Sequence, residues 1–323
     1  MSSLDTPVLL VIHRRPEATR RVFDAIAQAR PRRLFIAADG PATPGDRESC
    51  ALTRRVVQRV DWACEVAHDF SDQNLGLDSR MISAIDWALA SSESAIVLED
   101  DCLPHARFFT FCSSVLERYQ QDARVMHVSG ECYRATREGD RSYFFSKYPL
   151  AWGWATWRRA WAFFDPCMST WPGFRHQPEA RALFDSEDER RYWLSTFDRV
   201  HEDAPGGKHA SWDYAWYYAC MTNGLSIHPA VNLISNVGYG PLASNTHGTS
   251  DLSNRRVQIL EDDLRHPAWI VRDRQADLDT FDRRFPGAIL KQQRSLRHQL
   301  GRPGRWALRT LRRGVGSRPR LLL

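Results

Sequence analysis

The 323-residue chain lacks the features by which several classes of protein are recognised. Its seven cysteines form no CxxC pair and no Cys/His spacing of a zinc site, and their odd number does not suit a disulfide framework. No apolar run approaches the roughly 18 residues of a membrane-spanning helix, and residues 1–7 lack the basic and apolar regions of a signal peptide. We therefore expect reduced, mostly buried thiols in a cytoplasmic protein.

The body of the chain also lacks a surplus of positive charge. The formal net charge is +5, but residues 290–323 hold ten Lys and Arg and no Asp or Glu, which leaves about −5 for the rest. A mildly acidic body argues against a nucleic-acid partner. The tail suits a peripheral contact with the anionic inner face of a membrane, because its arginines and apolar residues would occupy opposite sides of a helix. A solvated tail without a partner is the alternative. The residues concerned are Arg305, Arg309, Arg312 and Arg313 on one side and Ala307, Leu308 and Leu311 on the other.

What the chain does have is a regular alternation of apolar runs and helical patterns. Hydrophobic residues make up 43% of the sequence, enough for a sizeable core. The alternation predicts an α/β fold with a mostly parallel central sheet and helices on both faces. Ligands of such folds bind at the carboxyl ends of the strands. The predicted strands lie at residues 8–12, 34–38, 64–67, 95–98 and 124–129, and helical patterns follow Pro16, Gly76 and Phe108.

Acidic residues follow two of the predicted strands. Glu99, Asp100 and Asp101 come directly after one strand, and Asp39 follows another. Three adjacent carboxylates repel one another, so a bound cation would help to hold them ionised. Their oxygens suit Mg²⁺ or Mn²⁺, with a diphosphate supplying further ligands. An acidic turn or helix start is the alternative for the triplet, and an ordinary turn is the alternative for Asp39.

Two arginines follow the first predicted strand. Arg14 and Arg15 suit the phosphate or base of a nucleotide, and exposed surface charge is the alternative. The connection that holds them contains no glycine. A nucleotidyltransferase would be expected to cradle its triphosphate in a Gly-rich loop at this place.

Residues 143–171 are rich in aromatic side chains. Because indole rings stack on the faces of sugars, Trp152 and Trp154 are candidates for an acceptor-binding surface. Core packing is the alternative, and it is the role expected of Trp157 and Trp161.

A single carboxylate lies among aromatic residues further along the chain. Asp213 stands between Trp212 and Tyr214. Aromatic neighbours exclude water and can raise the pKa of a carboxylate towards neutrality, as a general base requires. Capping of the helix that runs to Met221 is the alternative role for Asp213, and Asp78 is expected to cap the helix that follows Gly76.

An ordered set of short motifs resembles the N-acetylglucosaminyltransferase I family of GT-A-fold glycosyltransferases and its bacterial relatives. The order and rough spacing agree from Pro7 to about Gly248, about three quarters of the chain. The motifs are Pro7-Val8-Leu9-Leu10-Val11-Ile12 with the Arg pair, Ile36-Ala37-Ala38-Asp39-Gly40, Asp86-Trp87-Ala88-Leu89, Ile96-Val97-Leu98-Glu99-Asp100-Asp101 with Pro104 and Phe108-Phe109, Trp152-Gly153-Trp154, Ser211-Trp212-Asp213, Ile227-His228-Pro229-Ala230-Val231, and the loop from Gly238 to Thr246-His247-Gly248.

The resemblance implies a GT-A-like nucleotide-binding fold and roles for individual residues. Arg14 or Arg15, with Asp39, would hold the uracil end of a UDP-sugar. Glu99 and Asp100 would face the ribose and the sugar. Asp101 would bind the metal ion, Asp213 matches the family's catalytic base, and the loop 238–248 would close over the pyrophosphate. The remaining candidates are Arg80, Thr246 and His247 for the donor and Trp152, Trp154 and Trp212 for the acceptor.

The sequence therefore predicts a glycosyltransferase that uses Mn²⁺ or Mg²⁺. It would move a sugar from a nucleoside diphosphate donor to a hydroxyl of a glycan or lipid-linked acceptor in polysaccharide biosynthesis. A single base without a second acid as nucleophile predicts inversion at the anomeric carbon. The alternatives are a sugar-nucleotide nucleotidyltransferase, a metal-dependent phosphohydrolase and a non-catalytic glycan-binding protein. Residues 1–250 are expected to form the GT-A-like domain, with a nucleotide-sugar-binding half at 1–130 and an acceptor half with the closing loop at 131–250. Residues 251–323 would form a C-terminal extension.

Overall fold

The computed structural model describes residues 3–136, 139–204, 211–238 and 251–299, and its centre is an eight-stranded sheet of order β3-β2-β1-β4-β8-β6-β9-β7. The strands are β1 (Val8–Ile12), β2 (Arg33–Ala38), β3 (Glu65–Phe70), β4 (Ser94–Glu99), β6 (Val125–Ser129), β7 (Tyr143–Ser146), β8 (Trp154–Trp157) and β9 (Leu225–Pro229). The longer helices are α1 (Pro16–Ala29), α2 (Arg47–Val56), α3 (Leu77–Ala90), α4 (Ala106–Arg118), α8 (Glu187–Asp203), α9 (Trp212–Asn223), α10 (Arg274–Arg284) and α11 (Gly287–Gln299). Short helices are η1 (Pro44–Asp46), α5 (Arg158–Trp161), α6 (Trp171–Phe174) and α7 (Pro178–Ala182).

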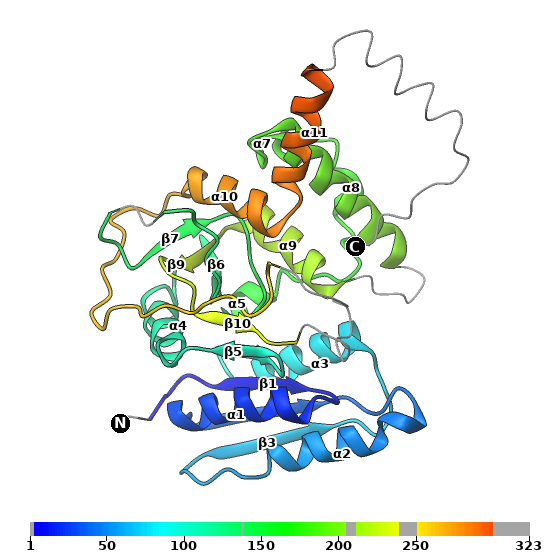
Figure 1. Cartoon of the computed structure of the whole chain (residues 1–323), viewed down its shortest axis with the longest axis vertical. Helices are drawn as coiled ribbons and strands as arrows, with labels where there is room; N and C mark the ends of the chain where they lie inside the picture. Colours follow the sequence, from blue (N-terminus) through cyan, green and yellow to red (C-terminus); the bar gives the residue numbers. More distant parts are fainter. Residues whose placement is uncertain (1–2, 137–138, 205–210, 239–250, 300–323) are drawn as a thin grey trace.

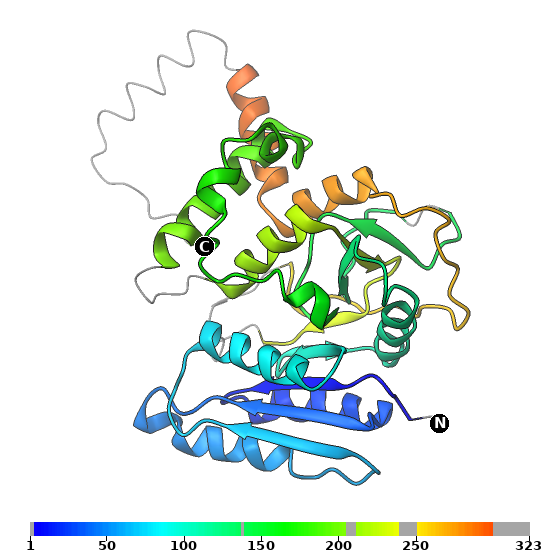
Figure 2. The same cartoon turned by 180° about the vertical axis from the view of Figure 1, so that it is seen from behind.

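The first half of the chain forms the parallel part of the sheet. Strands β3, β2, β1 and β4 run in the same direction, and every residue of β1 is buried. Helices α1 and α2 pack together on one face, whereas α3 packs against β1, β2 and β4 and meets α9 on the other (Figures 1 and 2). The predicted α/β fold, with a mostly parallel sheet covered on both faces, is confirmed.

Helix α1 illustrates how local sequence sets this arrangement. Pro16 occupies the first helical turn, where its missing N–H costs no hydrogen bond. The buried residues Val22, Phe23 and Ile26 recur at helical spacing and turn one face towards the sheet. The helix ends at Arg30, whose φ of 50° is left-handed and whose N–H bonds to Ile26 O.

The aromatic segment contains a strand that periodicity did not predict. Strand β8 lies antiparallel between β4 and β6, in the middle of the sheet. Trp154 and Trp157 are each 1% exposed, and the Trp157 Nε1–H donates to Leu116 O at 3.0 Å. Because both faces of β8 are covered, its residues do not alternate between apolar and polar, and an apolar run of four residues alone does not distinguish a strand from a buried helix.

The C-terminal extension lies against the edge of the sheet rather than apart from it. Asp273 N donates to Phe145 O at 2.7 Å, Ser142 N donates to Arg265 O at 3.0 Å, and α10 packs on β7. Figure 1 shows α10 and α11 above the second half of the sheet, beside α8 and α9.

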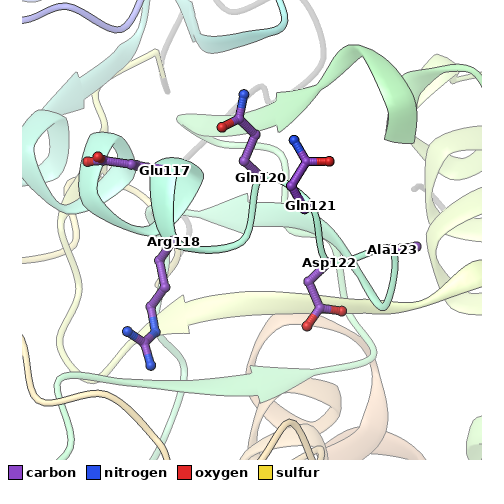
Figure 3. Close-up of a pocket in the computed structure, with 6 residues that line it drawn as sticks. All are labelled: Glu117, Arg118, Gln120, Gln121, Asp122 and Ala123. Carbon is purple, nitrogen blue, oxygen red and sulfur yellow. The ribbon is translucent and has the colours of Figure 1, made fainter.

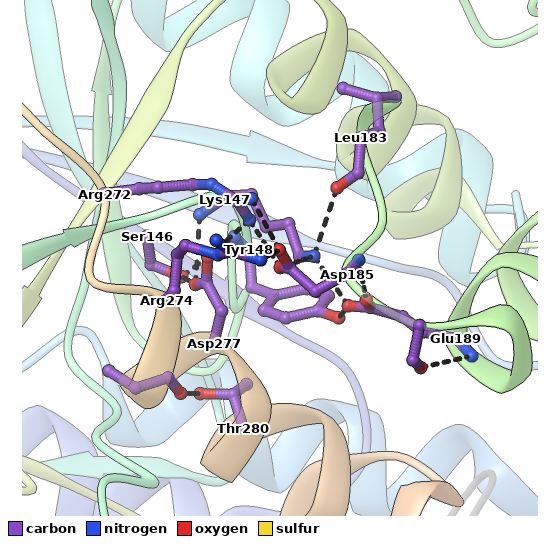
Figure 4. A network of polar contacts seen from close by, with 12 residues as sticks. Ser146, Lys147, Tyr148, Leu183, Asp185, Glu189, Arg272, Arg274, Asp277 and Thr280 are labelled. Carbon is purple, nitrogen blue, oxygen red and sulfur yellow. Dashed lines mark hydrogen bonds and ion pairs between the residues drawn. The ribbon is translucent and has the colours of Figure 1, made fainter. Parts of the chain in front are cut away.

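A buried ionic network fixes this extension in place (Figure 4). The Lys147 ammonium lies 3.1 Å from Asp185 and 2.7 Å from Glu189, and Arg272 lies 2.8 Å from Asp185 and 3.2 Å from Asp277. The Lys147, Asp185, Glu189 and Asp277 side chains are each at most 6% exposed. Although burial opposes ionisation, Arg272 and Lys147 hold the pKa of Asp185 down at about 2. The network joins β7, the start of α8 and α10.

Within the described segments, every helix is too short or too polar to cross a bilayer. The basic tail from Arg305 onwards, including the side predicted to contact membrane, lies outside the described residues.

Candidate functional site

A cavity of about 180 Å³ opens at the carboxyl ends of β1, β2 and β4. Six residues that the sequence put forward for donor binding line it, although they come from four separate stretches of the chain. These are Arg14, Arg15, Asp39, Arg80, Glu99 and Asp100. The strand ends of the parallel sheet therefore form one pocket that carries both signs of charge.

Arg15 is the cation at the centre of the acidic triplet. Its Nη2 lies 2.6 Å from Asp100 Oδ1 and its Nη1 lies 2.6 Å from Asp101 Oδ2. Burial disfavours the cation, but Asp100 and Asp101 raise the pKa of Arg15 well above its usual value. The two carboxylates therefore hold the guanidinium in a fork, which is the geometry that arginine favours.

The triplet still carries more negative than positive charge. Burial, then the charge of Asp101, raises the pKa of Glu99 to about 8. Burial also raises the pKa of Asp100, although Arg15 and the His13 N–H at 3.2 Å oppose the shift. With one arginine beside three acids, further positive charge entering the pocket would favour the ionised form of Glu99.

Asp39 organises the loop that forms one wall of the cavity. Its two carboxylate oxygens accept hydrogen bonds at 2.8–3.1 Å from the Gly40, Leu75 and Gly76 N–H groups and the Asn74 side chain. The Asp39 side chain thus joins the end of β2 to the start of α3. It lines the cavity with its hydrogen-bonding capacity largely used, and a contact with the uracil of a donor stays a prediction.

The other two arginines of the cavity differ in exposure. The Arg14 side chain is 36% exposed and its Nη1 lies 2.6 Å from Asp46, a residue of η1. Arg80 is 3% exposed and donates to Asp69 at 2.7 Å, while its Nε has no hydrogen-bond partner among the described residues. Arg14 is therefore the arginine of the pair at 14 and 15 that is open to a ligand, whereas Arg15 is held by the triplet.

The chain returns to the triplet just before the predicted closing loop. Strand β10 (Ile234–Asn236) pairs antiparallel with β5 (Cys102–Pro104), and Val237 N donates to Asp101 O at 2.8 Å. Gly238 then passes so close that an added Cβ would lie 2.0 Å from Asp101 Oδ2. The predicted loop therefore begins at the acid assigned to the metal. Thr246 and His247 themselves lie outside the described residues.

Asp213 acts electrostatically on the same group of acids from the other half of the molecule. It lies in the first turn of α9, close enough for its charge to act on Glu99. Burial raises the pKa of Asp213 to about 6, with Arg284 opposing the shift and Asp78 adding to it.

The capping role predicted for Asp78 is wrong, and so is the alternative that Asp213 is an N-cap. Ser211 is the N-cap of α9 and Gly76 is the N-cap of α3. Asp78 lies within the first turn of α3, and its carboxylate accepts the Trp212 N–H of α9 at 2.6 Å. A side chain from another helix therefore satisfies the Trp212 N–H of α9, while the Asp213 and Tyr214 N–H groups act on the Asp213 carboxylate itself.

The three tryptophans put forward for the acceptor are unequally accessible. Trp154 is 1% exposed and Trp212 is 5% exposed, and their rings stack at 5.8 Å inside the core. Neither offers a free face to a sugar, so core packing is what the structure shows for both. Trp152 is half-buried, and the Arg284 guanidinium lies 4.6 Å from its ring centroid. Of these three tryptophans, Trp152 is the most accessible, and its contact with an acceptor stays a prediction.

Sequence reasoning missed Asn74, Glu131 and Arg284 as parts of this region. Asn74 lines the cavity and bonds to Asp39, and Glu131 is 1% exposed and accepts the Trp152 N–H at 3.2 Å. Their spacing carries no motif, because tertiary contacts alone bring them together. A Glu two residues after a predicted buried strand was the one available signal for Glu131.

A divalent metal ion at this site would need ligands from the donor as well as from the protein. Among the described residues, no group of three or more His, Cys, Asp and Glu side chains is arranged to hold a metal ion. Asp101 Oδ2 bonds to Arg15, whereas Oδ1 accepts only a weak contact from the Cys102 thiol at 3.5 Å within the described structure. One carboxylate oxygen thus remains for a cation whose other ligands would be phosphate oxygens and water, a mode typical of Mg²⁺.

A second hollow, of about 400 Å³, lies at the end of α4 (Figure 3). The side chains that line it point in different directions, and Asp122 pairs with Arg124 at 2.7 Å. Because its polar groups do not converge, this open hollow offers no comparable site.

Comparison with known proteins adds little to this geometry. No family model and no curated protein matches the chain. A solved structure of UDP-glucose pyrophosphorylase complexed with UDP-glucose is similar at 10% identity and a TM-score of 0.29, over 50% of this chain and 79% of that chain. A 4-diphosphocytidyl-2C-methyl-D-erythritolsynthase from Anaerococcus prevotii DSM 20548 is similar at 8% identity and a TM-score of 0.31, over 60% and 83% of the respective chains. Likeness at this level assigns no activity, so function is argued from the site.

Proposed function

We propose that the chain is a glycosyltransferase that takes a sugar from a nucleoside diphosphate donor. The observation that carries the proposal is that two features occur together near the acidic triplet. The first is the charged cavity at the strand ends, and the second is Asp213, a carboxylate whose charge acts on Glu99 from α9.

The residues divide the proposed reaction between them. Arg14 and Arg80, at the cavity, would bind the nucleotide, and the triplet would face the sugar side. A divalent cation, held by Asp101 and by the donor's phosphate oxygens, would supply charge neutralisation of the departing diphosphate. Asp213 would accept the proton of the acceptor hydroxyl, as a base with a pKa of about 6 can do near neutral pH.

Direct attack of the acceptor oxygen would break the bond between the anomeric carbon and the diphosphate. With Asp213 as base and no covalent intermediate, the anomeric configuration of the product should be inverted. Retention in the product, measured by NMR of the new linkage, would overturn this part of the proposal.

The nucleotidyltransferase alternative is less well supported by the connection between β1 and α1. It consists of His13, Arg14 and Arg15, with Arg15 bound to two carboxylates. No Gly-rich stretch of backbone N–H groups is present there to cradle a triphosphate. Such an enzyme would also release pyrophosphate, which distinguishes the two activities directly.

The first test is binding. Calorimetric titration with UDP, CDP, GDP and NAD⁺, with and without Mn²⁺, should show a nucleoside diphosphate that binds, with affinity increased by the metal. Arg14→Ala should weaken that binding, and Arg20→Ala, an exposed arginine on α1, serves as the matched control. The proposal would be contradicted if the unmodified protein bound none of these nucleotides, or if the Arg14→Ala variant bound them as tightly as the unmodified protein.

A further inference from the structure

One arginine of the C-terminal extension carries a positive charge that no acceptor atom of the described chain satisfies. Arg284, the last residue of α10, makes no hydrogen bond or ion pair with any described residue, and its Nε is buried. The residue as a whole is half-buried, so part of it stays accessible. A guanidinium in this position is costly unless an anion pairs with it.

This lack of partners distinguishes Arg284 from other arginines whose Nε is buried without a hydrogen bond. In the part of the chain that the structure describes, three others share that feature, but each uses an Nη group on a carboxylate or a backbone carbonyl. Arg33 donates to Ser91 O, Arg54 to Ser71 O and Arg80 to Asp69. Arg284 has no such contact, so its N–H groups are left for a ligand.

Two aromatic rings hold the guanidinium. It lies 4.6 Å from the Trp152 ring centroid and 5.6 Å from that of Phe285. Contacts of this kind use the π-face of the ring and the charge of the arginine, and they consume none of its N–H groups. Those groups form a fork that binds a carboxylate or a phosphate through two parallel hydrogen bonds.

Glu131 does not supply the missing anion. Its Oε1 accepts the Tyr133 hydroxyl at 2.8 Å, and its Oε2 accepts the Trp152 N–H at 3.2 Å. Burial raises the pKa of Glu131, which weakens it as a counter-charge. Burial opposes the charge of Arg284 as well, but Tyr133, Tyr217 and Glu131 raise the pKa of Arg284, so it stays charged without a hydrogen-bonded acid.

Strand register places this arginine near the acidic triplet. Strand β4 pairs antiparallel with β8, with Val97 opposite Trp154. Two residues further along, the same register brings Trp152, and with it Arg284, to the level of Glu99. Neither Trp152 nor Arg284 lines the strand-end cavity, which has arginines of its own. The guanidinium therefore lies near the triplet but outside the cavity assigned to the nucleotide, which favours a group of the acceptor as its ligand.

Both ends of α10 are anchored, so the guanidinium is already in place before a ligand arrives. The Phe285 ring packs 5.0 Å from that of Trp193 and 5.3 Å from that of Tyr148. At the other end, Asp273 N donates to Phe145 O at 2.7 Å. Binding to a group that is held in this way costs little ordering.

We propose that Arg284, held over Trp152, is the binding site for an anionic group, a carboxylate or a phosphate, on the acceptor. That the ligand is an acceptor rests on the proposed function, whereas the anion site itself does not. The acceptor would then be an acidic or phosphate-bearing glycan, selected by a residue of the C-terminal extension.

Saturation-transfer NMR at low ionic strength tests the site without any donor. Glucuronate and glucose 6-phosphate should bind the unmodified protein, and uncharged glucose should bind at least about tenfold more weakly. Arg284→Met should lose about tenfold or more in affinity for both acidic sugars, and Arg284→Lys should lose less, because it keeps the charge without the fork. Arg283→Met, at an exposed arginine one position earlier, is the control and should bind as the unmodified protein does. If neither acidic sugar binds, or if Arg284→Met binds them as tightly as the unmodified protein, the proposal is overturned.

UDP separates the acceptor from the donor as the source of the anion. Its affinity should be the same for Arg284→Met and the unmodified protein. If Arg284→Met loses affinity for UDP but not for the acidic sugars, the anion belongs to the donor and the assignment to the acceptor is wrong.

Urea denaturation separates a binding role from a structural one. Without ligand, Arg284→Met should be at least as stable as the unmodified protein, since it removes a cation that has no partner. A clear loss of stability would show that the protein already satisfies the guanidinium, and would overturn the proposal. Acidic sugars that bind through Arg284 in a protein that consumes no nucleotide sugar would uphold the anion site and contradict the proposed function.

Discussion

Replacing Asp213 by Asn should stabilise the protein, although it removes the proposed base. Burial raises the pKa of this carboxyl from 3.8 to about 6. Each unit corresponds to about 1.4 kcal/mol, so the ionised side chain costs the folded state about 3 kcal/mol at neutral pH. Asn has the shape of the protonated acid and carries no charge, so Asp213→Asn should recover much of that amount.

The sign of the pH dependence follows from the direction of the shift. Well below pH 4 the carboxyl is protonated in both the folded and the unfolded chain, and it contributes nothing. Between about pH 4 and pH 6 the unfolded chain ionises while the folded protein keeps its proton, so stability falls as pH rises. Above about pH 6 the penalty is complete. The gain from Asp213→Asn should therefore be about 1 kcal/mol at pH 4.5 and about 3 kcal/mol at pH 7.5.

Urea denaturation followed by tryptophan fluorescence at the two pH values measures this gain. Asp24→Asn is the matched control, because Asp24 is an exposed residue of α1; its effect should stay within about 0.5 kcal/mol at both pH values. A less stable Asp213→Asn protein at pH 7.5, or a gain that does not depend on pH, would refute the reasoning that Asp213 is a strained, functional carboxylate.

Three further predictions concern the buried network, the loop entry and the metal. Lys147→Met should lower the free energy of unfolding by about 3–5 kcal/mol, because it leaves buried carboxylates without their cation. Arg274→Met is the control: its side chain is 70% exposed, so its loss should cost less than about 1 kcal/mol. Equal losses of stability in urea denaturation would contradict this prediction. Gly238→Ala should weaken nucleotide binding about tenfold in calorimetry, because the added Cβ would lie 2.0 Å from Asp101 Oδ2. Gly173→Ala is the control: it has open space around the added Cβ and should bind nucleotide as the unmodified protein does. Mn²⁺ should tighten nucleotide binding by the unmodified protein but not by Asp101→Asn, and a metal effect of the same size in both would exclude Asp101 as a ligand.

Apolar periodicity was sufficient to predict the parallel half of the fold. The runs at Val8–Ile12 and Arg33–Ala38 are buried strands bounded by turn residues, and α1 and α3 carry their apolar residues at helical spacing. The rule that ligands bind at the carboxyl ends of parallel strands then placed the candidate cavity. The antiparallel insertion of β8 could not be predicted, because its aromatic residues are buried on both faces and carry no period.

The candidate site was predictable where residues follow a strand, and not where tertiary contacts bring them together. Glu99 and Asp39 were found because each lies at a strand end. Glu131 and Arg284 were missed, since one is a single acid after β6 and the other ends a helix of the C-terminal extension. Trp154 shows the opposite error, because an aromatic residue suited to a sugar is equally suited to a core.

The most direct test of the account measures the rate at which the unmodified protein and the Asp213→Asn variant consume each of a panel of nucleotide sugars. Mass spectrometry identifies the products. The unmodified protein should release a nucleoside diphosphate from one of the donors. Asp213→Asn should bind that donor with nearly the same affinity and release the diphosphate about 10²–10⁴ times more slowly. Release at the same rate by both proteins, or formation of pyrophosphate in place of a nucleoside diphosphate, would contradict the claim that Asp213 and the strand-end cavity form the active site of a glycosyltransferase.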